Sequence, residues 1–228
     1  MGQVKRVLGF LMFAGLSAAQ DKPVVRASAE AVVQTAPDRA QIDIGVISQA
    51  ATAEAAGQEN ARRVQQVLTE LRKMLGPKAD IKTTQYSLSP TYRTARAGNT
   101  PEIGGYSASN VVQVRVDDLP AVGKVIDAAM RAGSNTIHSI QFSLRDEREA
   151  RAEALAKAAQ AARMDAEAIA KSLGLRVVRV LSAEQGDRAP IRPLMSARMA
   201  MAEAVQTPVE PGNIEVRASV TVTLEVQP

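Results

Sequence analysis

Alternating apolar and polar residues predict several β-strands. The clearest run covers residues 214–226, where Ile, Val, Ala and Leu side chains fill every second position and charged or hydroxyl side chains fill the others. Residues 40–46 alternate in the same way, and residues 24–34 precede them across the sequence Ala-Pro-Asp at 36–38. A period of two places one strand face in the core and the other in water. We therefore expect residues 24–34 and 40–46 to form a β-hairpin, and residues 214–226 to form a separate strand.

Four further segments have strand character. Residues 81–92 and 106–116 are separated by a segment with Gly, Asn and Pro, which is typical of a long hairpin loop. A short strand is expected around Ile140, where Phe142 and Leu144 follow on the same side, and another at residues 177–181.

Three segments change to a helical period. The first starts at Thr52, repeats Val and Leu on one face, and stops at Gly76. The second follows Asp118 as a capping residue and ends near Gly133, where a left-handed residue suits a helix terminus. The third, residues 146–173, is rich in alanine and opens with acidic residues that complement the helix dipole.

These patterns together predict an α+β fold with antiparallel sheets and amphipathic helices packed on one side. A doubly wound nucleotide-binding fold is not expected. The length suits one domain or two small ones, and no break in composition interrupts residues 20–185. We therefore treat residues 20–228 as one α+β domain with an irregular segment, rich in Met and Pro, at residues 186–212.

The amino terminus predicts export. Lys5 and Arg6 precede the apolar run at residues 7–16, and small residues end the segment at Ala19. The run is about half the roughly 20 residues that a membrane-spanning helix needs. We expect residues 1–19 to be a signal peptide cleaved after Ala19, a retained anchor being the alternative. No other segment is expected to span a membrane, so the mature chain is expected in the periplasm or outside the cell.

Composition excludes several functional classes. Cleavage would remove Lys5 and Arg6 from 28 basic residues and leave the 24 acidic ones, so the net charge falls from +4 to +2. Four aromatic residues would then remain, too few for a basic surface that stacks on nucleic acid. The chain has no cysteine, which excludes disulfides, thiolate metal sites and thiol redox chemistry.

Catalytic motifs are absent from the sequence. His138 is the single histidine, and strand alternation predicts that it shares a side with Ile140 and Phe142. A histidine with no recognisable nucleophile motif does not indicate a triad, and no flavin, haem or nucleotide motif is present. We expect no catalytic residue and no cofactor.

Two clusters suggest metal binding and have simpler explanations. The acidic residues Asp146, Glu147, Glu149 and Glu153 alternate with three arginines, which is typical of a solvated, self-neutralised helix face. Three thioethers, Met195, Met199 and Met201, are soft ligands for Cu(I) or oxidisable groups, or else adaptable apolar packing. Packing is favoured, because three thioethers without His or Cys seldom form a dedicated site.

Five local phrases stand out along the chain: APDRA at 36–40, IKTTQYSLSP at 81–90, GYSASN at 105–110, AGSNTI at 132–137 followed by Phe142, and the alanine-rich helix that ends at Leu173 and Gly174. Together they resemble the SIMPL-domain proteins, a family of periplasmic immunogenic and oxidative-stress-related envelope proteins. The resemblance covers nearly the whole mature chain and implies an exported α+β protein with no established catalytic residues. It also implies large homo-oligomers in some members and a link to envelope stress.

Three functional hypotheses follow. The first is a non-catalytic envelope protein that acts through homo-oligomeric assembly, with a role in envelope or oxidative stress defence. The second is a periplasmic module that binds a small ligand or peptide, with Tyr86, Tyr92 and Tyr106 as contact residues. A hydrolase ranks last, because no nucleophile and base pair up.

Overall fold

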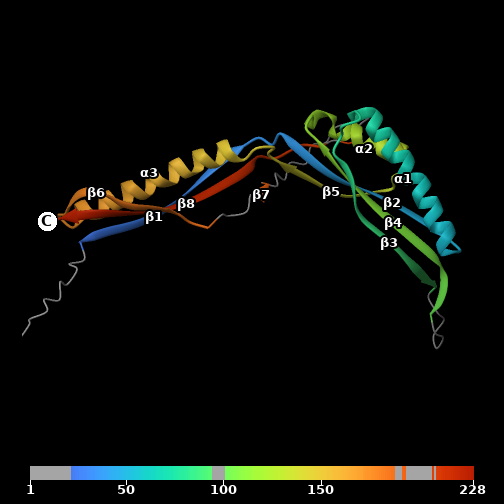
Figure 1. Cartoon of the computed structure of the whole chain (residues 1–228), viewed down its shortest axis with the longest axis horizontal. Helices are drawn as coiled ribbons and strands as arrows, with labels where there is room; N and C mark the ends of the chain where they lie inside the picture. Colours follow the sequence, from blue (N-terminus) through green and yellow to red (C-terminus); the bar gives the residue numbers. More distant parts are fainter. Residues whose placement is uncertain (1–21, 94–100, 188–191, 194–206, 208) are drawn as a thin grey trace, which may run out of the picture.

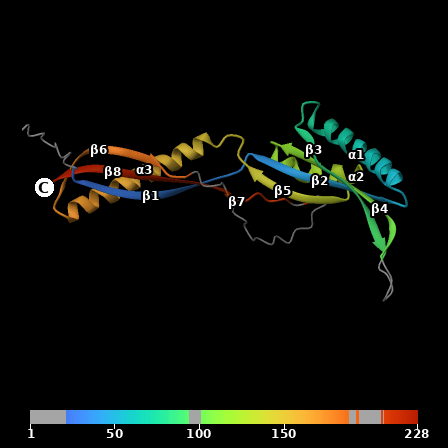
Figure 2. The same ribbon diagram turned by 60° about the horizontal axis from the view of Figure 1, so that its bottom comes forward.

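The structure is a computed structural model that describes residues 22–93, 101–187, 192–193, 207 and 209–228. Two antiparallel sheets form two lobes placed end to end, and helices cover one face of each sheet (Figures 1 and 2). The α+β class is therefore confirmed. Within the described residues, no helix combines the length and apolar character needed to cross a bilayer. In chain order the elements are β1 (Val24–Thr35), β2 (Arg39–Ala50), α1 (Ala53–Leu75), β3 (Ile81–Arg93), β4 (Glu102–Val116), η1 (Leu119–Ala121), α2 (Val122–Arg131), β5 (Thr136–Ser143), α3 (Arg148–Ser172), β6 (Arg176–Gln185), β7 (Arg192–Pro193) and β8 (Ile214–Gln227).

The first sheet, which we call sheet A, joins the two ends of the described chain. Its strand order is β1-β8-β6, and β7 also pairs with β8. β1 and β8 pair in one register from Val24 opposite Glu225 to Thr35 opposite Ile214, without a shift. The hairpin predicted for residues 24–34 and 40–46 is therefore wrong, because β1 and β2 belong to different sheets.

The segment at residues 36–38 crosses between the lobes instead of turning back. Pro37 is buried. The Asp38 backbone N–H donates to the Ser143 carbonyl (3.2 Å), and its Oδ1 accepts from the Arg145 N–H (2.7 Å). These partners, more than 100 residues away in sequence, hold the segment extended. It therefore connects β1 in one lobe to β2 in the other.

The second sheet, sheet B, has the order β3-β4-β2-β5. The inward face of β2 is fully buried at Ile42, Ile44 and Val46, and β4 adds Val112 and Val114. Helices α1 and α2 cover this face. Burying each such aliphatic side chain stabilises the fold by roughly 1.5–3 kcal/mol.

Local sequence signals explain where α1 begins and ends. The Thr52 side chain accepts from the Ala55 N–H (3.2 Å), and Gly76 ends the helix at φ +90°, a value that L side chains rarely adopt. The predicted terminus of α2 is also confirmed, with Gly133 at φ +118°. A 3₁₀ turn, η1, precedes α2, and the Asp118 side chain makes no capping hydrogen bond to it. The start of this helix thus differs from the prediction.

Helix α3 lies on sheet A mainly through alanine, with Leu155 packed beside the alanine row. Every fourth residue from Ala154 to Ala170 is buried, and these methyl groups pack on β1 and β8. Small side chains let the helix backbone approach the sheet closely. β6 extends beyond this cover: its residues are all exposed except half-buried Ser182.

Candidate functional site

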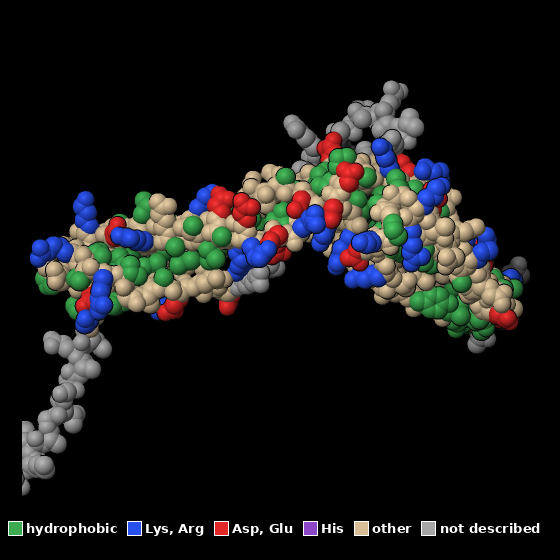
Figure 3. Space-filling view, turned by 45° about the horizontal axis from the view of Figure 1, so that its top comes forward, with side chains coloured by type: hydrophobic (Ala, Val, Ile, Leu, Met, Phe, Trp, Pro, Cys, Tyr) green, Lys and Arg blue, Asp and Glu red, His purple; other side chains and the backbone are tan. Residues whose placement is uncertain are grey.

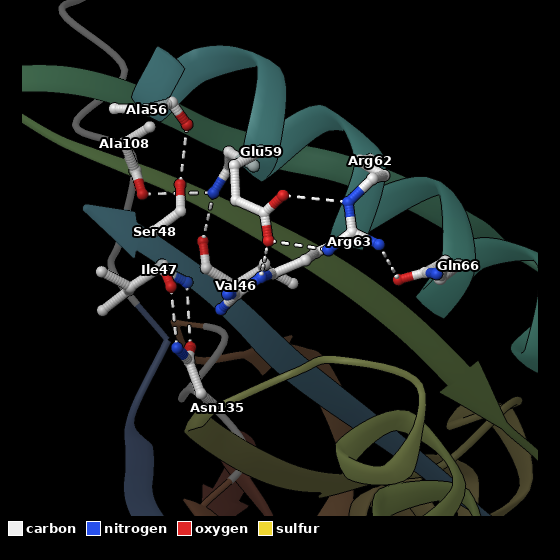
Figure 4. A network of polar contacts seen from close by, with 11 residues as sticks. Val46, Ile47, Ser48, Ala56, Glu59, Arg62, Arg63, Gln66, Ala108 and Asn135 are labelled. Carbon is white, nitrogen blue, oxygen red and sulfur yellow. Dashed lines mark hydrogen bonds and ion pairs between the residues drawn. The ribbon is translucent and has the colours of Figure 1, made fainter. Parts of the chain in front are cut away.

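The most buried polar group in the described residues is Asn60 of α1 (Figure 4). Its Nδ2 donates to the carbonyls of Val46 (2.8 Å) and Ala108 (3.1 Å), while its Oδ1 has no partner among the described residues. Nearby, the Ser48 hydroxyl donates to the Ala56 carbonyl (2.8 Å). These bonds attach α1 to β2 and β4. Sequence reasoning missed Asn60, although a polar residue within the apolar stripe of a helix was the available signal.

A charged group lies beside this anchor on the exposed side of α1 (Figure 4). The Glu59 carboxylate accepts from Arg62 (Nε, 2.9 Å) and from Arg63 (Nε, 2.6 Å). These hydrogen bonds, that of Arg62 first, lower the pKa of Glu59 from 4.5 to about 2. The cluster is an ion-pair network within one helix, which supports the helix and offers no reactive group.

Asn135 continues the pairing of β5 with β2 by means of its side chain (Figure 4). Its Oδ1 accepts from the Ile47 N–H (2.9 Å) and its Nδ2 donates to the Ile47 carbonyl (2.7 Å). The neighbouring Ser134 hydroxyl donates to the Gly45 carbonyl (2.9 Å). The phrase AGSNTI therefore has a structural explanation, since its amide replaces a backbone pair at the end of a strand.

His138 is placed differently from the prediction. The register between β2 and β5 shifts at Asp43 and Ile44, so a bulge at His138 reverses the alternation. Ile137, not His138, joins Ile140 and Phe142 on the core, and His138 is exposed. Its ring lies over Gly45 on the outer face of sheet B.

Next to His138, a polar network crosses the outer face of sheet B. Asp43 accepts from the Gln113 amide (2.9 Å) and from the Ser139 hydroxyl (2.7 Å), which ties β4, β2 and β5 together. A catalytic serine would instead donate to its histidine. No hydrogen bond within the described ranges joins His138 to Ser139 or to Asp43, so this trio lacks the arrangement of a triad.

The junction between the lobes carries a charge cluster. Asp117 accepts from Arg39 Nε (2.8 Å), and Arg145 Nε lies 3.6 Å from its other oxygen. These arginines, Arg39 first, lower the pKa of Asp117. A hollow of about 340 Å³ lies close by, with Asp38, Asp146, Glu149 and Glu153 among its lining residues.

Ion pairs engage two of the four acidic residues of this hollow. Arg148 binds Asp146 and holds its pKa at about 2, and Lys157 binds Glu153 (2.7 Å). Over the described ranges, no three His, Cys, Asp or Glu side chains are grouped to hold a metal ion. The methionines Met195, Met199 and Met201 lie outside the described residues.

The tyrosines do not converge on a cavity. Tyr86 and Tyr92 of β3 are 54% and 61% exposed, and Tyr106 of β4 is half-buried. A Cβ on Gly57 would stand 3.5 Å from the Tyr86 hydroxyl, so this ring lies against α1. A second hollow, of about 400 Å³, is lined by residues of α1 and by Arg131 and Ala132, away from all three rings.

Two strands at sheet edges, β3 and β6, leave apolar side chains uncovered. A band of hydrophobic side chains runs along the lobe of sheet A, while charged side chains gather at the lobe junction (Figure 3). β6 exposes apolar side chains along its length, and β3 exposes them at alternate positions. The exposed apolar residues of these strands are Tyr86, Leu88, Tyr92, Val177, Val178, Val180 and Leu181.

Comparison with known proteins agrees with this picture of an exported chain without a recognised reaction centre. The 26 kDa periplasmic immunogenic proteins of Brucella melitensis and Brucella abortus are each 27% identical over 212 residues, which cover 89% of this chain and 84% of theirs. The uncharacterized protein YggE of Edwardsiella ictaluri is 27% identical over 173 residues, or 75% of this chain and 72% of YggE. These names do not suggest catalysis, and the location is periplasmic or secreted. A family model described as SIMPL, protein of unknown function (DUF541), matches residues 25–224, so the chain belongs to the SIMPL family.

Proposed function

We propose that this protein is a non-catalytic envelope protein that acts through homo-oligomeric assembly. The observation that carries the proposal is strand β6, on which Val177, Val178, Val180 and Leu181 are 38–49% exposed. A chain that leaves four apolar side chains of one edge strand exposed keeps a surface of the kind that marks interaction sites. A second copy, always present at the same concentration, is the occupant that we assign to it.

Light scattering after size exclusion, over a dilution series of the chain from residue 20 onward, tests this assembly. A constant multiple of the protomer mass is expected. A protomer mass at every concentration would contradict the proposal. We also propose that residues 20–228 form a single structural unit after signal cleavage and that this unit associates with the envelope.

We extend the proposal to a role in envelope or oxidative stress defence. The chain has no cysteine for thiol redox chemistry, so any such role would be indirect. Protection would act through envelope integrity or through oxidation of methionine. Deleting the gene should raise permeability or peroxide sensitivity. If both stay at the wild-type level, the stress role is rejected.

The soft-metal alternative at Met195, Met199 and Met201 has a direct test. Titration of Cu(I) into wild type and into a variant with all three methionines replaced by Leu compares their affinities. Equal affinities would remove the metal role.

A binding module for a small ligand or peptide is the alternative function, and the exposure of Tyr86 and Tyr92 favours it. A metabolite or peptide that raises Tm in wild type, and less in a variant with both tyrosines changed to Ser, would support it. A screen in which no compound shifts Tm would leave assembly as the better account.

A further inference from the structure

The free edge of β1 differs from the other sheet edges. β3 contains Pro90 and two register shifts, β6 contains two shifts, and β5 is short with one shift. Prolines, bulges and short strands are the usual features that prevent edge-to-edge pairing. β1 has none of them within its twelve residues, and β8 is its single strand partner in the described chain.

The outward side chains of β1 are complementary to the same series read in the opposite direction. Along the face away from α3 they are Val24, Arg26, Ser28, Glu30 and Val32. If two copies of β1 pair in antiparallel fashion about Ser28, each Arg26 lies opposite Glu30 of the other copy and each Val24 lies opposite Val32. Directly opposite residues on one face have Cβ atoms about 5 Å apart, within reach of ion pairing and apolar contact.

We propose that two copies of this chain join through antiparallel pairing of β1 with β1, centred on Ser28. The inward face fits this register, because Ala27 then lies opposite Ala29 beneath the helices and no large side chains collide. The contact is isologous and closes a pair. It leaves the exposed apolar side chains of β6 free for larger assemblies, and it rests on the proposed self-assembly.

The charges on β1 are free to exchange partners. Arg26 lies 3.6 Å from Glu184 and Glu30 lies 3.4 Å from Arg217 within the chain, and all four side chains are exposed. Exposed pairs of this kind contribute little to stability. Neither prevents Arg26 or Glu30 from meeting a second copy.

A single introduced cysteine tests the register, because the chain contains no native thiol. Oxidation of Ser28→Cys should give a disulfide-linked dimer on non-reducing gels, since opposite residues in antiparallel strands meet the Cα spacing of a disulfide. Thr221→Cys is the matched control: Thr221 lies opposite Ser28 on the same face and shares its hydrogen bond (2.8 Å), so both variants lose that bond. In the proposed dimer the two Thr221 positions are three strand spacings apart, roughly 14 Å, and should not cross-link.

A charge swap separates contact between copies from contact within a copy. Arg26→Glu or Glu30→Arg alone should raise the dimer dissociation constant roughly tenfold, because each places like charges opposite each other twice. The double variant should return the constant to near wild type. If these charges mattered only through their pairs within one chain, the double variant would be worse than either single variant. It would place like charges next to both Glu184 and Arg217.

The outcomes distinguish this contact from assembly in general. If wild type assembles but Ser28→Cys cross-links no more than Thr221→Cys and the double variant shows no recovery, the β1 contact is wrong and another surface forms the assembly. The β1 contact is also wrong if the free edge of β1 is found to bind an extended peptide of another protein instead of a second copy. If wild type is monomeric at every concentration, both proposals fail.

Discussion

The imidazole of His138 lies over Gly45 on the outer face of sheet B, so close that a Cβ on Gly45 would stand 2.5 Å from Nε2. The same Cβ would stand 3.1 Å from the Cβ of Thr136. The single histidine of the chain therefore covers a strand glycine, which makes its role one of packing on the sheet.

Gly45→Ala is expected to lower the free energy of unfolding by about 1–2 kcal/mol, because the new methyl group displaces the ring and presses on Thr136. Adding His138→Ala should recover part of this loss, since it removes the nearer of the two obstacles. Urea denaturation of the wild type, both single variants and the double variant measures the coupling. Strictly additive effects would show that the ring and the glycine do not interact.

Asn60→Ala is expected to cost about 1–3 kcal/mol, because the carbonyls of Val46 and Ala108 lose their buried donor. Asn60→Asp should cost more at neutral pH, since a carboxylate would face two carbonyl oxygens, and less as acid protonates it. Gln58→Ala on the exposed side of α1 is the control, with an effect within about 0.5 kcal/mol. Denaturant midpoints compare the three variants, and equal losses for Asn60→Ala and Gln58→Ala would contradict the anchor.

The Glu59 cluster predicts a dependence of stability on pH. Because the folded pKa of Glu59 is lowered to about 2 from 4.5, its contribution is fully present above pH 4.5 and is lost as the pH falls toward 2. Arg62→Ala should raise the pKa of Glu59, since Arg62 is the largest cause of the shift. A carbon-13 titration of the side-chain carboxyl follows both proteins, and an unchanged midpoint in the variant would refute the assignment.

The alanine ridge of α3 predicts a sharp difference between two positions on one helix. Ala162→Leu should destabilise the protein by about 1–3 kcal/mol, because the fully buried methyl group has no room for three more carbons. Ala156→Leu adds the same group on the exposed side of α3 and should change little. Thermal melts of the two variants decide, and equal losses would mean that the helix does not lie close to the sheet.

Elements with strong local signals are the ones that the sequence predicted correctly. α1 has an apolar stripe interrupted only at Asn60, a Thr52 cap and a Gly76 terminus, and β8 alternates without interruption. In both, the local preference and the tertiary environment require the same conformation.

The errors occurred where distant contacts decide. Residues 36–38 have the composition of a turn, yet Ser143 and Arg145 hold Asp38 in an extended crossing between lobes. The prediction that His138 shares a strand face with Ile140 was wrong, because one bulge reverses the alternation of β5. A bulge of this kind cannot be recognised in the pattern of apolar and polar residues. The side chains whose roles the sequence did not reveal, Asn60 and Asn135, act on backbone groups.

The pairing of β1 with β8 places the two ends of the described chain side by side, whereas residues 39–143 form sheet B without a break in sequence. A chain exported with its amino end leading can therefore close sheet B early, while sheet A lacks its central strand until the last fourteen-residue strand arrives. β1 has no strand partner between its own emergence and the emergence of β8. The order of emergence thus delays the lobe that carries the proposed contact until β8 has crossed the membrane, so the proposed contact can form only after that step.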